Sequence, residues 1–321
     1  MKGLKTDIHY GKRRIEFLFV LLLIILPLAL VHGQKDAQYT QYMYNTVTVN
    51  PAYAGSRGHL SIAALYRNQW LGLDGAPRTQ TLNVHSPVGY RGVGLGLSVV
   101  NDKIGPTSET DFGIDFSYTI PISWNGNLSF GLKASAHMLD IRYSELDEFE
   151  IDPQLTSQQD IQNKFSPNIG AGVYYHTDRF YLGLSAPRIL ETTHFDESSV
   201  TTSLEQFNLY LIGGHVWDLN RNWKFKPALM AKVVQGAPLQ LDLSANFMWN
   251  EKFIGGLAYR WDAAFSGLFG FMVSEQMMIG VAYDREITEL GAASFNDGSI
   301  EIILRYDFIR NIGNFRSPRF F

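Results

Sequence analysis

The chain has 321 residues, of which 45% are hydrophobic and 18% are charged, and it contains no cysteine. These totals suit one large β-rich domain, and the lack of cysteine excludes a disulfide framework, thiol catalysis and Cys-ligated metal sites. The formal net charge is −4, which does not favour binding of nucleic-acid phosphates.

The amino terminus has the features of a secretory signal peptide. A basic head precedes an almost unbroken apolar run from Phe17 to Val31, and short side chains follow before Gln34. We therefore expect a signal peptide over residues 1–33, cleaved before Gln34. A membrane anchor, the alternative, would need about 20 apolar residues, and Pro27 shortens the run. The rest of the chain has a formal charge of −7, because residues 1–33 hold five of the 27 basic and two of the 31 acidic side chains.

Residues 34–57 do not have a strand-like pattern. The first part is polar with a cluster of tyrosines, and Asn50, Pro51 and Gly55 are turn-forming residues. Two interpretations stay open for this segment. It is either a leader into the first strand on the periplasmic side, or a segment folded into the lumen of a barrel.

The stretch from Asp111 to Ile120 shows the pattern that the rest of the chain repeats. Its even-numbered residues are apolar and its odd-numbered residues are polar or glycine, which is the period of a strand with one apolar face. Strands of about ten residues, at about 3.3 Å per residue and a tilt of about 40°, span an apolar band of about 25 Å. Strands of soluble proteins are usually about half as long.

The same alternation predicts fourteen strands along residues 58–309. They are expected over 58–69, 78–87, 92–101, 108–120, 127–143, 166–177, 179–186, 204–217, 222–234, 238–249, 252–261, 264–273, 277–287 and 298–309. Joins after the even-numbered strands are short, and the longest joins, 144–165 and 187–203, follow odd-numbered ones. An even strand number with short turns at one rim is typical of a transmembrane outer-membrane β-barrel. The sequence thus predicts an all-β barrel of about 14 antiparallel strands, a tail over 310–321, and both termini in the periplasm.

The alternation also predicts which side chains face lipid. Leu239, Leu241 and Leu243 would face outward, while Gln240, Asp242 and Ser244 would face the lumen, since a charge on the lipid side costs about 2–4 kcal/mol near the midplane. The six tryptophans all fall at or beside predicted strand ends, where interfacial aromatic girdles lie.

Small inward residues predict space inside the barrel. Gly92, Gly94, Gly96 and Ser98 of the third strand would all face the lumen. We hypothesise that residues 35–57 or a loop occupy this space.

Several motifs carry a resemblance to a known family. They are QYTQYMYN (38–45), NPAYAGS (50–56), YRNQW (66–70) with Pro77 and TQT (79–81), and, less specifically, VGLG (93–96), PNIGAGVYY (167–175), LGLS (182–185) and FRSPRFF (315–321). Across the mature chain the sequence resembles the PorP/SprF family of the Bacteroidota type IX secretion and gliding motility systems.

The resemblance implies an outer-membrane barrel that works with the secretion machinery and is not an enzyme. Implied partners are a secreted adhesin or other cargo with a C-terminal sorting domain, which the barrel helps to export or anchor, and a periplasmic peptidoglycan-binding lipoprotein. It implies no catalytic motif, cofactor or metal. We predict that partners bind exposed segments at both ends, where cationic and aromatic residues are typical anchors: Gln38, Tyr39, Tyr42, Asn50, Pro51, Tyr53, Arg316, Arg319, Phe320 and Phe321.

The sequence also bears on three other functions. A passive porin-like channel or small-solute transporter is the main alternative, since fourteen strands enclose a lumen and inward charges could line a pore. A hydrolase is disfavoured, because His85 and Ser86 point to opposite faces of a strand. His137 and Asp140 also diverge unless a bulge intervenes between them. Acidic residues over 140–152 could supply oxygen ligands for calcium, but their spacing matches no calcium-binding loop.

Overall fold

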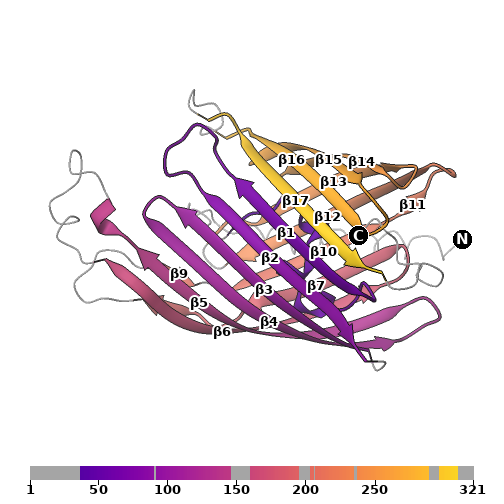
Figure 1. Ribbon diagram of the computed structural model, residues 1–321, viewed down its shortest axis with the longest axis horizontal. Helices are drawn as coiled ribbons and strands as arrows, with labels where there is room; N and C mark the ends of the chain where they lie inside the picture. Colours follow the sequence, from indigo (N-terminus) through magenta and orange to yellow (C-terminus); the bar gives the residue numbers. More distant parts are fainter. Residues whose placement is uncertain are drawn as a thin grey trace, which may run out of the picture. The chain divides into compact units, whose positions relative to one another are not determined.

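A computed structural model describes residues 37–89, 92–145, 160–194, 203–205, 207–234, 237–288 and 296–309. Fourteen antiparallel strands close into a barrel (Figure 1). They are β1 (Leu60–Asn68), β2 (Arg78–Val88), β3 (Val93–Ile104), β4 (Thr107–Pro121), β5 (Asn127–Ile141), β6 (Ile161–His176), β7 (Phe180–Arg188), β10 (Asn208–His215) continued by β11 (Trp217–Asp218), β12 (Trp223–Val234), β13 (Gln240–Trp249), β14 (Phe253–Arg260), β15 (Ala264–Met272), β16 (Met277–Glu286) and β17 (Ser299–Phe308).

Each strand pairs with its neighbours in sequence, and the first and last strands close the barrel. In this seam β1 pairs with β17 over nine residues, from Leu60 opposite Phe308 to Asn68 opposite Ile300. Figure 1 shows the two strands, at opposite ends of the colour scale, side by side. The sheet edge is therefore removed, as a membrane-spanning sheet requires.

The strand predictions are confirmed, with three local differences, one of which is that β6 begins at Ile161 and not at residue 166. The expected strand over 204–217 is divided into β9 (Ser203–Glu205), β10 and β11, and β9 forms a separate hairpin with β8 (Thr192–His194). In addition, β3 and β4 run further than expected, so that only Gly105 and Pro106 join them. Hydrogen-bonded pairing continues beyond the apolar band here, which the alternation pattern could not show.

The longest connections lie at one rim, although that rim also holds the tight joins at 105–106 and 261–263. At the other rim, short connections follow β4, β6, β11, β13 and β15, and we call this end the short-turn rim. The opposite end, the long-loop rim, carries the connections over 69–77, 142–160 and 189–207. Strands β3 to β6 have 12 to 16 residues, whereas β13 to β17 have 8 to 10.

The two faces of the wall differ as the alternation predicted. On β17, Glu301 and Arg305 are buried, while Ile302 and Leu304 are each 41% exposed on the outer surface. Five of the six tryptophans are exposed near a rim, and the sixth, Trp70, donates its indole N–H to Glu286. The described part of the chain holds no helix with the length and apolarity needed to cross a membrane.

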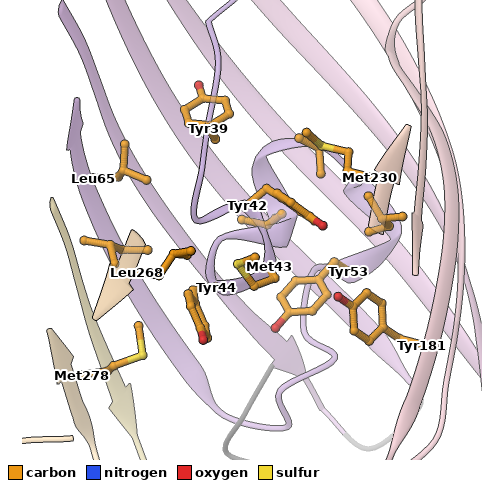
Figure 2. Packing of buried hydrophobic residues seen from close by; sticks show 14 of the residues in the cluster. Tyr39, Tyr42, Met43, Tyr44, Tyr53, Leu65, Tyr181, Met230, Leu268 and Met278 are labelled. Atoms are coloured by element: carbon orange, nitrogen blue, oxygen red, sulfur yellow. The ribbon is translucent and has the colours of Figure 1, made fainter. Parts of the chain in front are cut away.

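The lumen is filled by the described part of the N-terminal segment, residues 37–57, which we call the lumenal segment. It forms three short 3-10 turns, Tyr42–Tyr44, Thr46–Thr48 and Pro51–Tyr53. The last begins at Asn50, whose side-chain oxygen accepts a hydrogen bond from the Ala52 amide at 2.9 Å, a helix-capping contact. Figure 2 shows tyrosines of this segment among wall residues such as Tyr181, Met230 and Met278.

Candidate functional site

Glycines on five wall strands make room for the lumenal segment. A side chain at Gly131 of β5 would overlap the main chain of Ala52, and one at Gly94 of β3 would overlap the carbonyl oxygen of Ala54. Gly172, Gly183 and Gly280 similarly lie against side chains of Asn50 and Gln41. The prediction of space beside the third strand is confirmed at Gly94 and Gly96, where Ala54 of the lumenal segment fills it. Gly92 precedes β3, is exposed and lies against Thr119 of the wall.

Buried charges of the wall hold the beginning of the segment. Glu301 accepts hydrogen bonds from the main-chain N–H groups of Thr40, at 2.9 Å, and Gln41, at 2.8 Å. The Thr40 hydroxyl donates to Asp284 at 2.7 Å. Arg67 lies between these carboxylates, 2.6 Å from Asp284 and 3.3 Å from Glu301. Hydrogen bonds to charged groups are roughly twice as strong as neutral ones.

The end of the segment is held near the short-turn rim. Arg57 donates through Nε and Nη2 to the two carboxylate oxygens of Asp307, at 3.1 and 2.8 Å. The same carboxylate accepts the Ser61 hydroxyl at 2.7 Å. Gly55 donates its N–H to Nδ1 of His85 at 3.2 Å. His85 therefore has a structural contact with the segment.

The middle of the segment makes neutral hydrogen bonds to several strands. Asn83 of β2 donates to Asn45 Oδ1 at 2.9 Å and to Thr48 Oγ1 at 3.0 Å. Ser185 of β7 donates to the Val49 carbonyl at 2.7 Å. Burial raises the pKa of Tyr42 and of Tyr44 above the usual range of a phenol, so both remain neutral. The segment is thus packed as the core of the barrel.

The structure brings the six predicted N-terminal contact residues together inside the barrel. Tyr39, Tyr42, Asn50 and Tyr53 are at most 8% exposed, and Pro51 is also buried. Gln38 accepts a hydrogen bond from Arg260 at 2.9 Å. While the segment occupies the lumen, a partner cannot contact these buried side chains. The other four predicted residues, Arg316, Arg319, Phe320 and Phe321, lie outside the described residues, as does the expected signal peptide.

A polar cavity of about 60 Å³ lies between the lumenal segment and strands β3, β4, β5, β7 and β10. Its lining includes Tyr39 of the segment together with Asp111, Lys133, Arg188 and Tyr210 of the wall. These strand residues, apart from Lys133, belong to the half nearer the long-loop rim. The cavity has room for a few water molecules or one small side-chain group.

Ion pairs organise the wall of this cavity. Asp111 lies 3.1 Å from His137 Nδ1 and accepts a hydrogen bond from Arg188 at 3.0 Å. Lys133 pairs with Asp115 at 3.1 Å and donates to Ser98 at 3.1 Å. His137 and Asp111 are cross-strand partners on β5 and β4. This pair depends on the register between β4 and β5, which the spacing of residues along a single strand does not give.

Among the described residues, no group of three or more potential ligands is placed to hold a metal ion. Of the acidic stretch weighed as a calcium site, Asp140 accepts a hydrogen bond from the Asn163 amide at 2.7 Å. Residues 146–152 of that stretch lie outside the described residues.

The comparison with protein families decides the affiliation. A family model described as type IX secretion system membrane protein PorP/SprF matches residues 31–306. The chain belongs to the PorP/SprF family. No match was found among curated proteins. Together with the closed barrel, the family places this chain in the outer membrane.

The comparison with solved structures found chains similar to this PorP/SprF member. The Ralstonia pickettii toluene transporter TbuX is 10% identical, with a TM-score of 0.50 over 82% of this chain and 92% of that chain. The Acinetobacter baumannii outer membrane protein Omp33 is 8% identical, with a TM-score of 0.47 over 78% and 98%. The P. putida toluene transporter TodX is 10% identical, with a TM-score of 0.43 over 82% and 93%. At these identities the likeness concerns the fold alone.

Proposed function

We propose that this PorP/SprF protein binds a secreted surface protein of the type IX system at the long-loop rim and helps to export or anchor it. The observation that carries the proposal is the filled lumen. The lumenal segment crosses from Arg57, at the short-turn rim, to Gln38, which contacts Arg260 at the opposite end of β14. A barrel filled in this way acts through its rims.

The charges of the lumen also support a binding role over transport. The sequence pattern places several charged side chains on the inward face, where they could line a pore. Three of them each form an ion pair within the wall: Asp115, Asp242 and Arg305. Paired and buried charges do not form the water-filled surface that a general diffusion pore needs. Passive transport of small solutes is the alternative function. It predicts that the purified chain conducts ions across a bilayer.

The two rims offer different surfaces to partners. Short turns face the periplasm in bacterial outer-membrane barrels, and long loops face outward. We assign the secreted adhesin or other cargo to the long-loop rim. The peptidoglycan-binding lipoprotein is assigned to the short-turn rim. The proposal gives the protein no catalytic step.

Photo-cross-linking at three matched leucines tests this assignment. A photoreactive amino acid would replace Leu73 on the long-loop rim, Leu219 on the short-turn rim, or Leu257 on the outer wall, which are 36%, 56% and 71% exposed. Adducts in native outer membranes are then identified by mass spectrometry. We expect a large secreted protein at Leu73, a periplasmic protein at Leu219, and neither at Leu257. Absence of rim adducts, combined with ion conductance of the purified barrel in liposomes, would support the channel instead.

We further propose that the carboxy-terminal tail contributes to the periplasmic contact through Arg316, Arg319, Phe320 and Phe321. Deletion of residues 311–321 should leave a heat-modifiable barrel in the membrane and reduce the adduct formed at Leu219. A deletion that prevents membrane insertion would instead indicate that the tail is an assembly signal.

A further inference from the structure

We propose that the lumenal segment is a clamp across the seam between β1 and β17, so that the barrel closes around it and retains it during function. The seam joins the first and last strands of the wall, which are far apart in the chain. Such a contact has the largest loop-closure entropy of any strand pair here. A segment that binds both strands adds contacts that offset this entropic cost of closure.

One end of the clamp lies on Arg67 and Glu301, which face each other directly across the seam. Glu301 of β17 accepts the two amides of Thr40 and Gln41. Arg67 of β1 donates to the Thr40 hydroxyl at 3.1 Å and pairs with Glu301. Asp284 of β16 completes the group. The segment therefore contacts both strands through one continuous set of hydrogen bonds.

The other end of the clamp lies on Ser61 and Asp307, which are also directly opposed across the seam. Arg57 binds both oxygens of Asp307, and Ser61 of β1 donates to one of them. His59 lies 3.3 Å from the same carboxylate. At this end the segment binds β17 through Arg57, and β1 binds the same carboxylate directly through Ser61. The side chains of both groups are almost fully buried.

Two consequences distinguish a clamp from a removable plug. Withdrawal of the segment would leave Glu301 and Asp307 without several of their donors, which is unfavourable for buried carboxylates. Loss of the segment should also loosen the seam before it loosens strand pairs elsewhere in the wall. A removable plug would detach without changing the β1–β17 pairing.

Hydrogen exchange measured by mass spectrometry on the full mature chain in detergent micelles tests the clamp. Deleting the whole segment would test membrane insertion as well as closure, so point variants are preferable. Glu301→Gln replaces one acceptor oxygen with an NH2 donor, which then faces either the Gln41 amide or the Thr40 amide together with Arg67. We expect the amides of β1 and β17 to exchange at least about tenfold faster, because charged hydrogen bonds are lost at the seam. Arg57→Ala should accelerate the end of β1 nearest Leu60.

Asp115→Asn is the matched control. It also removes a buried wall carboxylate that pairs with a cation, Lys133, but it lies on β4, away from the seam. Its effect should be confined to β3, β4 and β5. If Glu301→Gln accelerates exchange equally in all strands, or leaves β1 and β17 as protected as in the parent chain, the segment does not clamp the seam and the proposal fails.

Discussion

The two faces of each barrel strand lie in different surroundings. On the outer face of β13, Leu243 and Phe247 are 45% and 41% exposed, whereas on its inner face Asp242 is 6% exposed and Asn246 is fully buried. The outer face meets a fluid solvent of acyl chains, which adapts to the shape of any apolar side chain. The inner face meets the lumenal segment, whose atoms have fixed positions.

This difference determines which changes each face tolerates. Outside, polarity decides the effect of a substitution, because lipid cannot satisfy a charge or a hydrogen-bonding group. Inside, shape and pairing decide it, since the packed interior accepts charges only with partners and tolerates little change of volume. Substitutions on opposite faces of one strand therefore give a direct test of this comparison.

The largest effect is expected inside, at Asp307. Asp307→Ala leaves Arg57 and Arg305 without the carboxylate that both contact. Breaking a buried ion pair by removing one partner costs about 3–5 kcal/mol. The free energy of unfolding in urea, followed by the fluorescence of the tryptophans at the rims, should fall by this amount. Leu304→Met on the outer face of the same strand should change it by about 0.5 kcal/mol or less. Equal losses for the two variants would contradict the comparison.

A charge on the outer face should give the next largest loss. Leu243→Arg places a cation on the lipid side, with a cost of about 2–4 kcal/mol near the midplane. Urea unfolding from lipid bilayers measures this change, and Leu243→Met is the neutral control. The inner face already holds fully buried Lys226, whose ammonium lies 4.5 Å from the centre of the Tyr44 ring. The buried cation on the inner face thus has a specific aromatic neighbour, whereas an arginine at position 243 would face lipid.

The sequence predicts the wall better than its contents for a physical reason. Alternation with a period of two identifies all fourteen strands and their outward faces, because lipid imposes the same demand on every second residue. Gly94 and Gly96 also indicate that something approaches the wall closely. The partners of Glu301, Arg67 and Asp307 do not follow from any period, since they depend on the path of a segment without regular structure. Cross-strand pairs such as Asp111 with His137 require the register, which the alternation leaves undetermined.

Two glycines, one on each face of the wall, test the same difference with a smaller expected change in stability. Gly131→Ala directs a methyl group into the main chain of Ala52, whereas at Gly255 on the outer face an added methyl group meets no atom within 4 Å. Overpacking of a tight interior costs about 1–3 kcal/mol. Gly255→Ala should leave stability unchanged or raise it by up to about 1 kcal/mol, because alanine restricts the unfolded chain. Both values come from urea unfolding, and a stable Gly131→Ala variant would show that the segment can shift.

The smallest effect is expected for an ion pair outside the lumen. Arg179 and Asp218 lie 2.5 Å apart near the short-turn rim, with side chains that are 63% and 41% exposed. Arg57 and Asp307 form the same type of pair at 2.8 Å, but their side chains are 6% and 4% exposed. Because water and salt screen the exposed pair, Arg179→Ala should cost less than about 1 kcal/mol, and this loss should vanish in 1 M salt, where the Debye length is about 3 Å.

Arg57→Ala should cost several times more than Arg179→Ala, and salt should change its effect little, since ions do not reach the packed lumen. Urea unfolding of both variants at low and high salt measures this contrast. If salt reduced both losses alike, ions would have access to Arg57 and Asp307. The lumenal segment would then not seal the barrel at the short-turn rim. The contrast between a packed lumen and a solvent-exposed rim would not hold at that end.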